Sequence, residues 1–363
     1  MASLKELAAE LGVSHTLVSR VLNNRMGTAR VGVKTREAIL RRAREMDYRP
    51  NPLAVALKRG RKGAVGVFIH QVGVEGSDLS LRFLEAASSA LAKERLNLWL
   101  QFFKSEKEFL AACNQRLTHS IDGLIIAGIG HPELAETLAQ LEENGMPIIC
   151  TSETEDMPLG FTTIRPDQAR HNYLTTRHLI ETGCRRIAHF DTIPLRRAGY
   201  LQALAEANIE PDPELIIRDK GFTADTGAML TAKLLESGIK FDAINAQSDA
   251  QGAGAMRYLS EIGLPQSEWP KITGVDDSPI AHSYSIVPLT TTTSCLPQCA
   301  ELAVSALLKK LNGEPTESLV VTPRLVVRES TLGEVKFSQS LRPVTSGLKK
   351  PRSVQNTAGR TCI

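Results

Sequence analysis

A short polar run near the amino terminus has residue types and spacing that suit contact with nucleic-acid bases. In SHTLVSRVL, residues 14–22, the side chains predicted to face outward on a helix are those of His15, Thr16, Ser19 and Arg20. The apolar residues between Leu17 and Leu22 recur at helical spacing and are predicted to be buried. An arginine near the start of such a helix can bridge O6 and N7 of guanine in the DNA major groove. From spacing alone, a generic helical hairpin remains the alternative.

A second candidate site depends on two predicted strands that end close together. Arg196 follows the apolar run RRIAHFD, and Asp276 ends the run KITGVD. A guanidinium offers a planar fork of donors, whereas a carboxylate offers acceptors. Parallel α/β sheets bind small molecules beyond the carboxyl ends of their strands. The pair therefore predicts a site for a polyhydroxylated or anionic small molecule.

Motifs for catalysis and for metal binding are weak in this sequence. His178, Cys184 and His189 lack compact ligand spacing, so no metal site is predicted. The run GIG at 128–130 falls short of a dinucleotide fingerprint, and the sequence contains neither a GxSxG elbow nor a Walker loop. We predict no enzymatic activity and no cofactor.

The formal net charge of +3 over 363 residues conceals an uneven distribution. Residues 1–63 contain 14 Lys and Arg against 5 Asp and Glu, residues 336–363 contain 6 against none, and the middle is left with a net charge of −12. Basic ends on an acidic body favour a polyanionic partner such as nucleic acid. The apolar runs are shorter than the roughly 20 residues of a membrane span, the amino terminus does not resemble an export signal, and the six cysteines lack CxxC spacing. These features predict a cytoplasmic protein with free thiols and no membrane contact.

Three short helices are predicted to position the first site. The first spans about 3–11 and ends at Gly12, and Ser14 caps the second. The third spans about 34–47 and follows Gly32, a weaker cap than serine. Its predicted core residues are Ile39, Leu40, Ala43 and Met46.

From Lys62 onward, strand-like and helix-like segments alternate. The apolar runs are AVGVFIH, LNLWLQFF, DGLIIAG, MPIIC, RRIAHFD, ELIIRD, DAINAQ and KITGVD. The helix-like stretches lie at about 80–95, 132–144, 170–183, 196–208, 223–237 and 250–262. This alternation predicts two buried parallel sheets, each within its own α/β subdomain.

Two amino-terminal segments and six shorter motifs occur in an order typical of one family. The segments are LKELAAELGVSHTLVSRVLNN and KTREAILRRAREMDYRPNPLAVAL, and the motifs are DGLIIAG, HLIETGCRRIAHF, RRAGYLQAL, GVDD, VPLTT and RLVVREST. Together they resemble the lactose/galactose repressor (LacI/GalR) family of bacterial transcription regulators. The resemblance covers the chain up to about residue 335.

The resemblance implies DNA-binding roles for ten residues. His15 and Thr16 occupy positions that vary with operator sequence, and Arg20 occupies a position that contacts a base or a phosphate. The positions that resemble phosphate contacts are Ser14, Ser19, Asn23, Thr35 and Tyr48. Leu57 takes the place of a leucine that opens a central base step from the minor groove, with the small Ala54 on the same face.

The resemblance also places Arg196 and Asp276 at positions that contact a small-molecule effector. Ser248 stands where the family usually has asparagine; this shortens the side chain and removes an amide, so the specificity of the pocket stays open. Asp249 is predicted to cap the following helix rather than contact effector. Asp167 is likewise predicted to be structural.

The predicted fold class is α+α/β: an N-terminal three-helix helix-turn-helix headpiece with a hinge helix, followed by a two-subdomain α/β clamshell like that of periplasmic binding proteins. The predicted domains are the headpiece at 1–50, the hinge helix and linker at 51–62, an effector-binding and dimerisation domain at 63–335, and a basic disordered tail at 336–363. Within the third domain, the N-subdomain comprises about 63–162 and 292–322, and the C-subdomain about 163–291 and 323–335.

The predicted function is that of a sequence-specific transcriptional regulator, a repressor, which binds a near-palindromic operator as a homodimer. Its predicted partners are double-stranded DNA and a small-molecule effector, a sugar or related metabolite, and its predicted location is the bacterial cytoplasm, at the nucleoid when bound. Two alternatives stay open. One is a cytoplasmic clamshell protein that binds a small ligand without operator function, and the other is an α/β enzyme that uses the same cleft.

Overall fold

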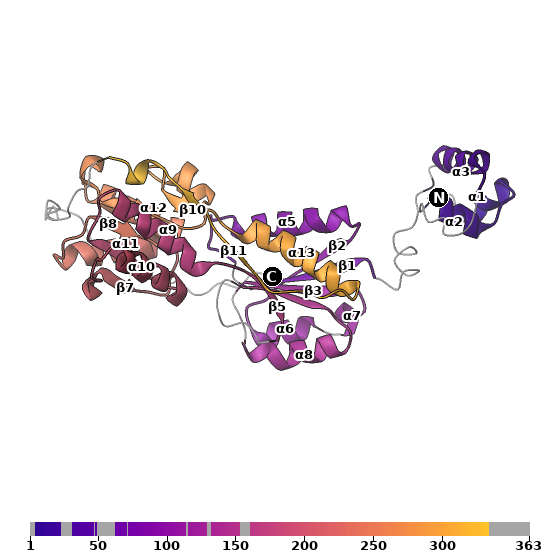
Figure 1. Cartoon of the computed structure of the whole chain (residues 1–363), viewed down its shortest axis with the longest axis horizontal. Helices are drawn as coiled ribbons and strands as arrows, with labels where there is room; N and C mark the ends of the chain where they lie inside the picture. The colour runs from indigo at the N-terminus through magenta and orange to yellow at the C-terminus, as the bar shows by residue number, and fades with distance from the viewer. Residues whose placement is uncertain are drawn as a thin grey trace, which may run out of the picture.

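The computed structural model describes eight segments of the chain: 4–22, 31–46, 48, 62–70, 72–113, 115–128, 132–152 and 160–333. The predictions for Asn23, Ala54 and Leu57, for the tail, and for the hinge segment up to residue 61 lie outside these residues. The described residues form a headpiece of three helices, a first lobe and a second lobe, each with its own apolar core (Figure 1).

The headpiece consists of α1 (Leu4–Glu10), α2 (His15–Leu22) and α3 (Val33–Glu45). Its core residues are Leu7, Ala8, Val18, Val21, Ile39 and Ala43, with Leu40 and Met46 packed against them, as predicted. Gly12 ends α1 with a φ of 61°, a conformation that glycine adopts without steric cost. The Ser14 hydroxyl accepts a hydrogen bond from the Leu17 amide at 3.2 Å, which confirms the predicted cap of α2.

An ion pair joins the first and third helices of the headpiece. The guanidinium of Arg42 lies 2.6 Å from the Glu10 carboxylate and 3.0 Å from that of Glu45. These hydrogen bonds raise the pKa of Arg42. Because the three side chains are exposed, the apolar core rather than the ion pair accounts for most of the stability of the headpiece.

The first lobe contains a six-stranded parallel sheet in the order β11-β5-β4-β3-β1-β2. Its strands are β1 (Ala64–His70), β2 (Asn97–Phe102), β3 (Gly123–Gly128), β4 (Ile148–Ser152), β5 (Thr162–Pro166) and β11 (Leu319–Val321). The strands predicted in this lobe are confirmed to within two residues at their starts. Successive side chains of β1 point to opposite faces, so Val67 belongs to one core cluster and Phe68 to another.

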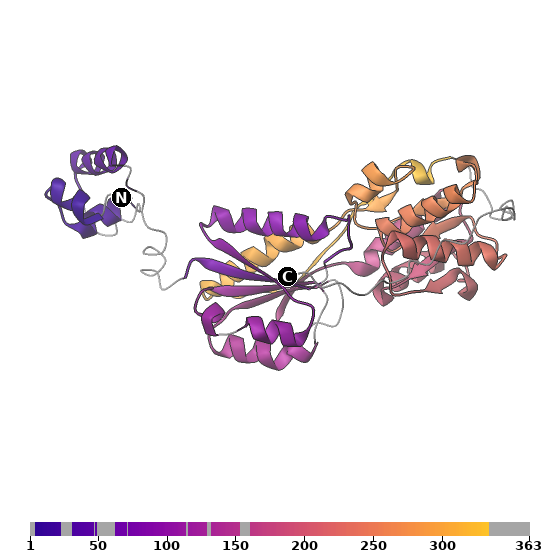
Figure 2. The same ribbon diagram turned by 180° about the vertical axis from the view of Figure 1, so that it is seen from behind.

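Helices cover both faces of this sheet, as Figures 1 and 2 show. Helices α5 (Leu79–Lys93) and α13 (Leu296–Leu311) pack on one face and share a core with the side chains of Val65, Val67 and Ile69. On the other face lie α6 (Glu106–Ala112), α7 (Gln115–Thr118), a 3-10 turn (Pro132–Leu134) and α8 (Ala135–Glu143). Both faces are therefore buried, which explains why β1 and β3 are continuous apolar runs.

The second lobe repeats this layered arrangement with a four-stranded parallel sheet in the order β7-β6-β8-β9. The strands are β6 (Ile187–Asp191), β7 (Ile216–Arg218), β8 (Ala243–Asn245) and β9 (Lys271–Thr273). Helices α9 (Gln168–Glu181) and α10 (Pro194–Glu206) cover one face, and α11 (Ala224–Glu236) and α12 (Asp249–Glu261) cover the other. All four helices lie within two residues of their predicted bounds.

The chain passes between the lobes three times. The first passage follows β5, which extends the first sheet to Pro166, slightly beyond the predicted position near 162. The other two passages adjoin the short antiparallel strands β10 (Thr291–Thr292) and β12 (Leu325–Val326), which pair with each other. Two histidines of α9 hold these segments: His171 Nδ1 lies 2.7 Å from the Thr292 hydroxyl, and His178 Nε2 lies 2.8 Å from that of Thr331.

Two glycines allow α11 and α12 to approach each other closely. A Cβ atom added at Gly227 would lie 2.1 Å from the carbonyl oxygen of Gln251, and one added at Gly254 would lie 1.9 Å from that of Ala224. Both obstacles are backbone atoms, so a side chain at either position must push the helices apart.

Replacing Gly254 with alanine is therefore expected to destabilise the second lobe by about 1–3 kcal/mol, despite the higher helix propensity of alanine. Urea unfolding followed by circular dichroism measures the change. Ser260→Ala, at an exposed position of the same helix, is the matched control and is expected to leave the midpoint nearly unchanged. A Gly254→Ala midpoint at or above that of the control would contradict the close approach.

Candidate functional site

Seven of the residues predicted to contact DNA lie in the described part of the headpiece, and each is at least partly exposed. On and before α2, Ser14, His15, Thr16 and Arg20 are exposed, Ser19 is partly buried, and Val18 and Val21 are buried. Thr35 on α3 and Tyr48 after it are partly buried. Burial raises the pKa of Tyr48 above its ordinary value. The outer face of α2 thus presents short polar side chains and the exposed guanidinium of Arg20 to the solvent.

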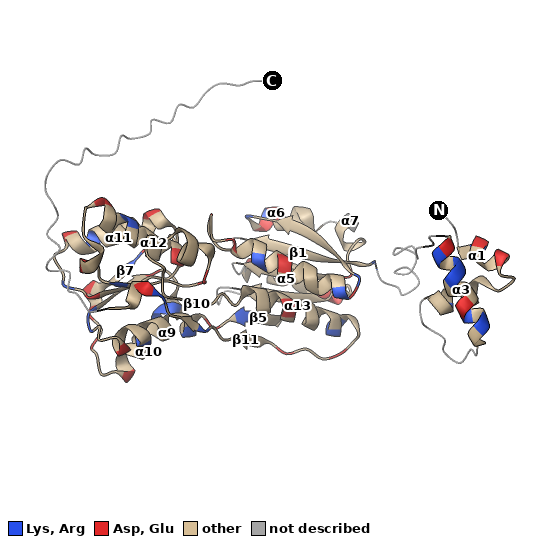
Figure 3. Ribbon diagram, turned by 90° about the horizontal axis from the view of Figure 1, so that it is seen from above, with Lys and Arg blue, Asp and Glu red and all other residues tan. Residues whose placement is uncertain are grey.

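Basic residues gather on the third helix as well. Figure 3 shows blue ribbon along α3, which carries Lys34, Arg36, Arg41, Arg42 and Arg44. Arg42 is engaged with Glu10 and Glu45, whereas the Arg41 side chain is 76% exposed. This charge favours approach of a polyanion without selecting its sequence.

Arg196 is buried at the start of α10, beyond the carboxyl end of β6. Its side chain is 3% exposed, and its Nε donates to the Gln168 side-chain oxygen at 2.7 Å. One terminal nitrogen donates to the carbonyl oxygen of Gln247. Within the described residues, the other terminal nitrogen has no hydrogen-bond partner, so part of this fork of donors is available to a ligand.

Asp276 lies just beyond β9 and is bound to one of the segments that connect the lobes. Its amide donates to the carbonyl oxygen of Thr292, and its own carbonyl oxygen accepts from the Ser294 amide at 3.0 Å. Its φ of 107° is unusual for a residue other than glycine. Burial raises the pKa of Asp276, and the charges of Arg196 and Arg82 oppose that rise.

The folded chain brings Arg196 and Asp276, which are 80 positions apart, into electrostatic contact. No ion pair among the described residues joins them directly. Arg196 follows the carboxyl end of β6 and Asp276 that of β9, two strands of the same sheet. A charged donor and a charged acceptor that are not paired with each other can both bind a polyhydroxylated molecule.

The cap of α12 differs from the prediction. Ser248, not Asp249, is the N-cap: its hydroxyl accepts from the Gln251 amide at 3.1 Å and donates to the Phe222 carbonyl oxygen at 2.7 Å. The prediction that Asp249 caps this helix is wrong, because its carboxylate turns inward. It accepts hydrogen bonds from the amide and hydroxyl of Ser278 and from the hydroxyl of Thr291.

Arg82 is a residue that analysis of the sequence missed. It lies on α5 of the first lobe, and its guanidinium donates to the Asp277 carbonyl oxygen of the second lobe at 3.1 Å. The Asp277 carboxylate in turn lies 2.6 Å from Arg328, which follows β12. Arg82 therefore reaches the same segment as Asp276 from the opposite lobe. No local pattern marks it, because its partner is 195 positions away.

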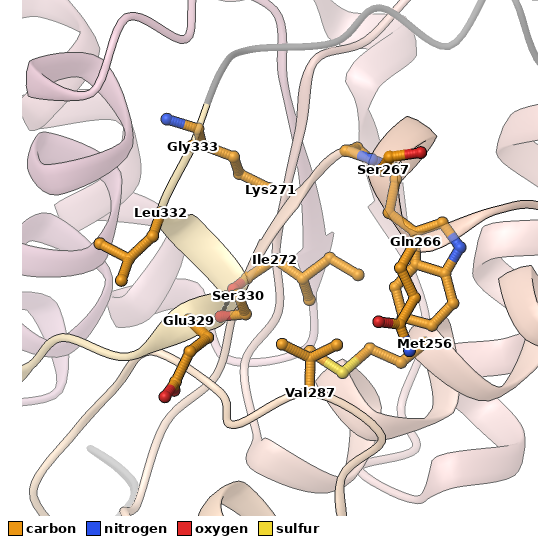
Figure 4. A pocket seen from close by; sticks show the side chains of 12 residues that line it. Met256, Gln266, Ser267, Lys271, Ile272, Val287, Glu329, Ser330, Leu332 and Gly333 are labelled. Atoms are coloured by element: carbon orange, nitrogen blue, oxygen red, sulfur yellow. Dashed lines mark hydrogen bonds between the residues drawn. The ribbon is translucent and has the colours of Figure 1, made fainter.

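Asp167 and a pocket of the second lobe are distinct from the predicted effector contacts. The Asp167 carboxylate caps α9 by accepting from the Arg170 amide at 3.0 Å, so its predicted structural role is confirmed. A pocket of about 300 Å³ is lined in part by Met256, Trp269 and Lys271. Figure 4 shows Met256 and Lys271 among the side chains around it. Lys271 begins β9, so this pocket lies near the amino end of that strand. Arg196 and Asp276 do not line it.

The described residues contain neither a metal-binding cluster nor a membrane-spanning helix. No group of three or more His, Cys, Asp or Glu side chains there is arranged to hold a metal ion. None of the helices in that part of the chain is long and apolar enough to cross a membrane.

Comparison with known proteins agrees with this arrangement of a helical headpiece and two α/β lobes. Residues 3–51 match the family described as "Bacterial regulatory proteins, lacI family", and residues 176–331 match "Periplasmic binding protein-like domain". The transcriptional regulator CelR of Thermobifida fusca is 28% identical over 357 residues, which cover 90% of this chain and 98% of the relative. The ribose operon repressor of Haemophilus influenzae is 27% identical and covers 91% of this chain and 98% of the repressor.

Solved structures show the same fold. A CelR–cellobiose complex matches with a TM-score of 0.64 and 27% identity, over 91% of this chain and 100% of the other. The lac repressor dimer bound to operator and the anti-inducer ONPF matches with a TM-score of 0.72 and 24% identity, over 92% of this chain and 99% of the other.

The headpiece and the two lobes define a DNA-binding transcriptional regulator with a periplasmic-binding-protein-like domain. Its amino-terminal DNA-binding domain is that of the LacI family of bacterial regulatory proteins, and the similarity to regulators with this domain extends over 90% of the chain. Its relatives in that family are transcriptional regulators and repressors.

The buried carboxyl of Asp249 generates a prediction about pH. Burial, reinforced by the charge of Asp276, raises the pKa of Asp249 to about 8 from an ordinary value of 3.8. Between about pH 4 and pH 8, the Asp249 carboxyl is therefore protonated in the folded protein and ionised in the unfolded chain. This contribution to stability is complete below pH 4 and is lost as the pH rises through 8.

Asp249→Asn is expected to remove that dependence, because an amide can satisfy Ser278 and Thr291 without ionising. Relative to the variant, the free energy of unfolding of the wild type is expected to fall by up to about 1.4 kcal/mol per pH unit across this window. Urea unfolding at several pH values gives the difference curve. Asp225→Asn, at an exposed carboxylate, is the control, and parallel curves for wild type and Asp249→Asn would refute the shift.

Proposed function

We propose that this regulator is a repressor that binds a near-palindromic operator as a homodimer and responds to a small carbohydrate or related metabolite bound between its lobes. The observation that carries the proposal is the outer face of α2, where exposed His15, Thr16 and Arg20 stand over the buried Val18 and Val21. The proposal includes no catalytic step, and it places the protein in the bacterial cytoplasm, at the nucleoid when bound to DNA.

In this proposal α2 enters the major groove, because a helix with short polar groups and one arginine fits that groove. His15, Thr16 and Arg20 contact base edges, and the residues proposed to hold the phosphates are Ser14, Ser19, Asn23, Thr35 and Tyr48. Leu57 is proposed to open a central base step, with Ala54 on the same face; both lie outside the described residues. One headpiece offers a small contact area, so two copies on two half-sites are needed for strong discrimination.

Exposed apolar side chains on the first lobe support the proposed dimer. Trp99, Leu100 and Phe102 on β2, an edge strand of the sheet, are 40%, 39% and 54% exposed, and Leu81 on the adjoining α5 is 55% exposed. An unpaired edge with large apolar side chains invites association with another chain. Pairing two copies there would bury both edges.

Arg196 and Asp276 are the proposed effector contacts. Carbohydrates offer many hydroxyls that both donate and accept, which suits a guanidinium beside a carboxylate. The 27% identical relative CelR was solved as a complex with cellobiose, which supports a saccharide. Ser248 remains a predicted effector contact, although its hydroxyl already makes two hydrogen bonds within the chain.

Effector binding is proposed to control DNA binding by changing how the lobes close. Asp276 is hydrogen-bonded to the segment around β10, and Arg82 joins the other lobe to Asp277. A ligand that contacts Asp276 therefore acts directly on connections between the lobes. A coupling free energy of about 1–3 kcal/mol is enough to change operator occupancy.

The DNA-binding face is tested by Arg20→Ala. Loss of a base contact is expected to weaken operator binding by about 1–3 kcal/mol while non-specific binding changes little. Fluorescence anisotropy with an operator duplex, selected from genomic fragments, and with a scrambled duplex measures both affinities. Arg41→Ala removes an exposed charge from α3 and is expected to affect both duplexes alike. An equal loss on the two duplexes with Arg20→Ala would make Arg20 a phosphate contact.

The effector site is tested by Asp276→Asn, which removes the charge and keeps a residue type that tolerates positive φ. Saccharide binding and the saccharide response of DNA binding are expected to be lost, while operator affinity is retained. Calorimetry against a panel that includes cellobiose and ribose, with operator anisotropy, measures both. Asp225→Asn is the control. A normal saccharide response from Asp276→Asn would place the site elsewhere.

A further inference from the structure

We propose that His189 is a positioning residue of the effector site, and that its imidazole, protonated on Nδ1, orients Gln247 and thereby holds Arg196 ready for ligand. The inference rests on the proposed function in that it takes Arg196 as an effector contact. Neither His189 nor Gln247 touches the ligand in this proposal.

His189 is a polar residue at the centre of β6, between the apolar Ala188 and Phe190. It lies in β6, is fully buried, and stacks on the Tyr200 ring with centroids 4.5 Å apart and an interplanar angle of 10°. A buried imidazole without partners would be strongly destabilising, so its two ring nitrogens must both be satisfied. Stacking on Tyr200 accounts for an aromatic ring at this position, but it does not account for the two ring nitrogens of histidine.

The amide of Asn245 sets the first of these two contacts. Its nitrogen lies 2.7 Å from the Thr175 hydroxyl, and that hydroxyl donates to carbonyl oxygens of its own helix, α9, so it accepts from Asn245. The Asn245 side-chain oxygen therefore faces His189 Nδ1, at 3.0 Å, as an acceptor. A carbonyl oxygen cannot donate, so Nδ1 carries the proton.

The second contact follows from the first. With the proton on Nδ1, Nε2 is an acceptor, and the Gln247 side-chain nitrogen donates to it at 2.9 Å. The Gln247 amide oxygen then points to the Ile193 amide and accepts from it at 2.7 Å. The orientation of the Gln247 side-chain amide is thus set by a series of hydrogen bonds that runs from α9 to β8 and then to β6.

Gln247 is connected to Arg196 at two places. The main-chain carbonyl oxygen of Gln247 accepts from a terminal nitrogen of Arg196. Its side-chain oxygen accepts from the main-chain amide of Ile193, the N-cap of α10. Arg196 lies three residues after that cap. Gln168 completes the support by accepting from Nε. The guanidinium is therefore fixed before ligand arrives, which reduces the entropy lost on binding.

The arrangement also requires that His189 stay neutral, because a protonated Nε2 would face the donor of Gln247. Burial lowers the pKa of His189 to about 4. Of the surrounding groups, Arg196 and Arg197 lower this pKa further, whereas Asp191 and the bond to Asn245 raise it. The neutral form is accordingly maintained from about pH 5 to pH 8.

The tautomer is tested directly on the full-length wild-type protein without ligand. Histidine labelled with ¹⁵N in the ring distinguishes a protonated from an unprotonated nitrogen by chemical shift, and His189→Gln assigns the signal. We expect His189 to be protonated on Nδ1 and not to titrate between pH 5 and pH 8. Protonation on Nε2, or titration near pH 6.5, would overturn the proposal.

Two substitutions separate positioning from packing. His189→Phe keeps the stacked ring and removes the acceptor, whereas His189→Gln loses the ring but offers an oxygen to Gln247. The readout is the solvent exchange rate of the Arg196 Nε proton by NMR, assigned with Arg196→Lys. We expect exchange to be about tenfold faster in His189→Phe, corresponding to loss of one buried hydrogen bond, and slower in His189→Gln than in His189→Phe. A purely structural role would reverse that order.

Phe190→Leu, which alters the adjacent buried residue on the other face of β6, controls for general destabilisation. Calorimetry with cellobiose and ribose then tests binding, and affinity is expected to fall about tenfold in His189→Phe relative to Phe190→Leu. If no saccharide binds the wild type, the proposed effector class fails, whereas the tautomer and the Arg196 exchange rate still decide the role of His189. Equal Arg196 exchange in His189→Phe and Phe190→Leu would refute that role.

Discussion

The burial of the Arg196 guanidinium is the constraint on which the polar architecture of the second lobe depends. A buried cation that lacks partners is costly, yet a guanidinium fully enclosed by partners could not bind a ligand. In this chain the neutral acceptors of Gln168 and Gln247 satisfy two of its nitrogens, and the nearby Asp276 carboxylate forms no ion pair with it among the described residues. Neutral acceptors satisfy the donors without neutralising the charge, so the field of Arg196 remains available at the ends of the strands.

The same logic explains the buried carboxyl of Asp249. Beside Asp276 and out of water, a second carboxylate would be repelled, and its raised pKa keeps it neutral. Its hydrogen bonds to Ser278 and Thr291 fix the loop after β9 to the segment at β10. The position of Asp276 is therefore set jointly by the lobe core and by a connection between lobes, which is the arrangement required if a small ligand is to alter lobe closure.

The headpiece is held together by an apolar core, whereas the second lobe combines its apolar core with buried polar contacts. Its six buried apolar residues hold three short helices together, and His15, Thr16 and Arg20 of α2 lie outside that core and are exposed. Such a division allows the exposed residues of α2 to differ among related proteins without loss of the fold. The second lobe cannot separate the two tasks in this way, because Arg196 and Ser248, two of the proposed effector contacts, are buried and also make hydrogen bonds within the chain.

The sequence by itself determined the elements of this protein. Apolar periodicity placed the four helices of the second lobe within two residues, continuous apolar runs marked eight of the ten described parallel strands, and Gly12 and Ser14 marked the turn of the headpiece, because these signals depend on neighbours along the chain. Tertiary structure decided which polar groups meet. Packing brings Arg82 to Asp277 and His189 to Gln247. Packing also turns the Asp249 carboxylate inward, so that Ser248 is the cap of α12. The spacing of residues along the chain does not predict these contacts, because a buried polar group bonds to the groups that the fold places within hydrogen-bonding distance.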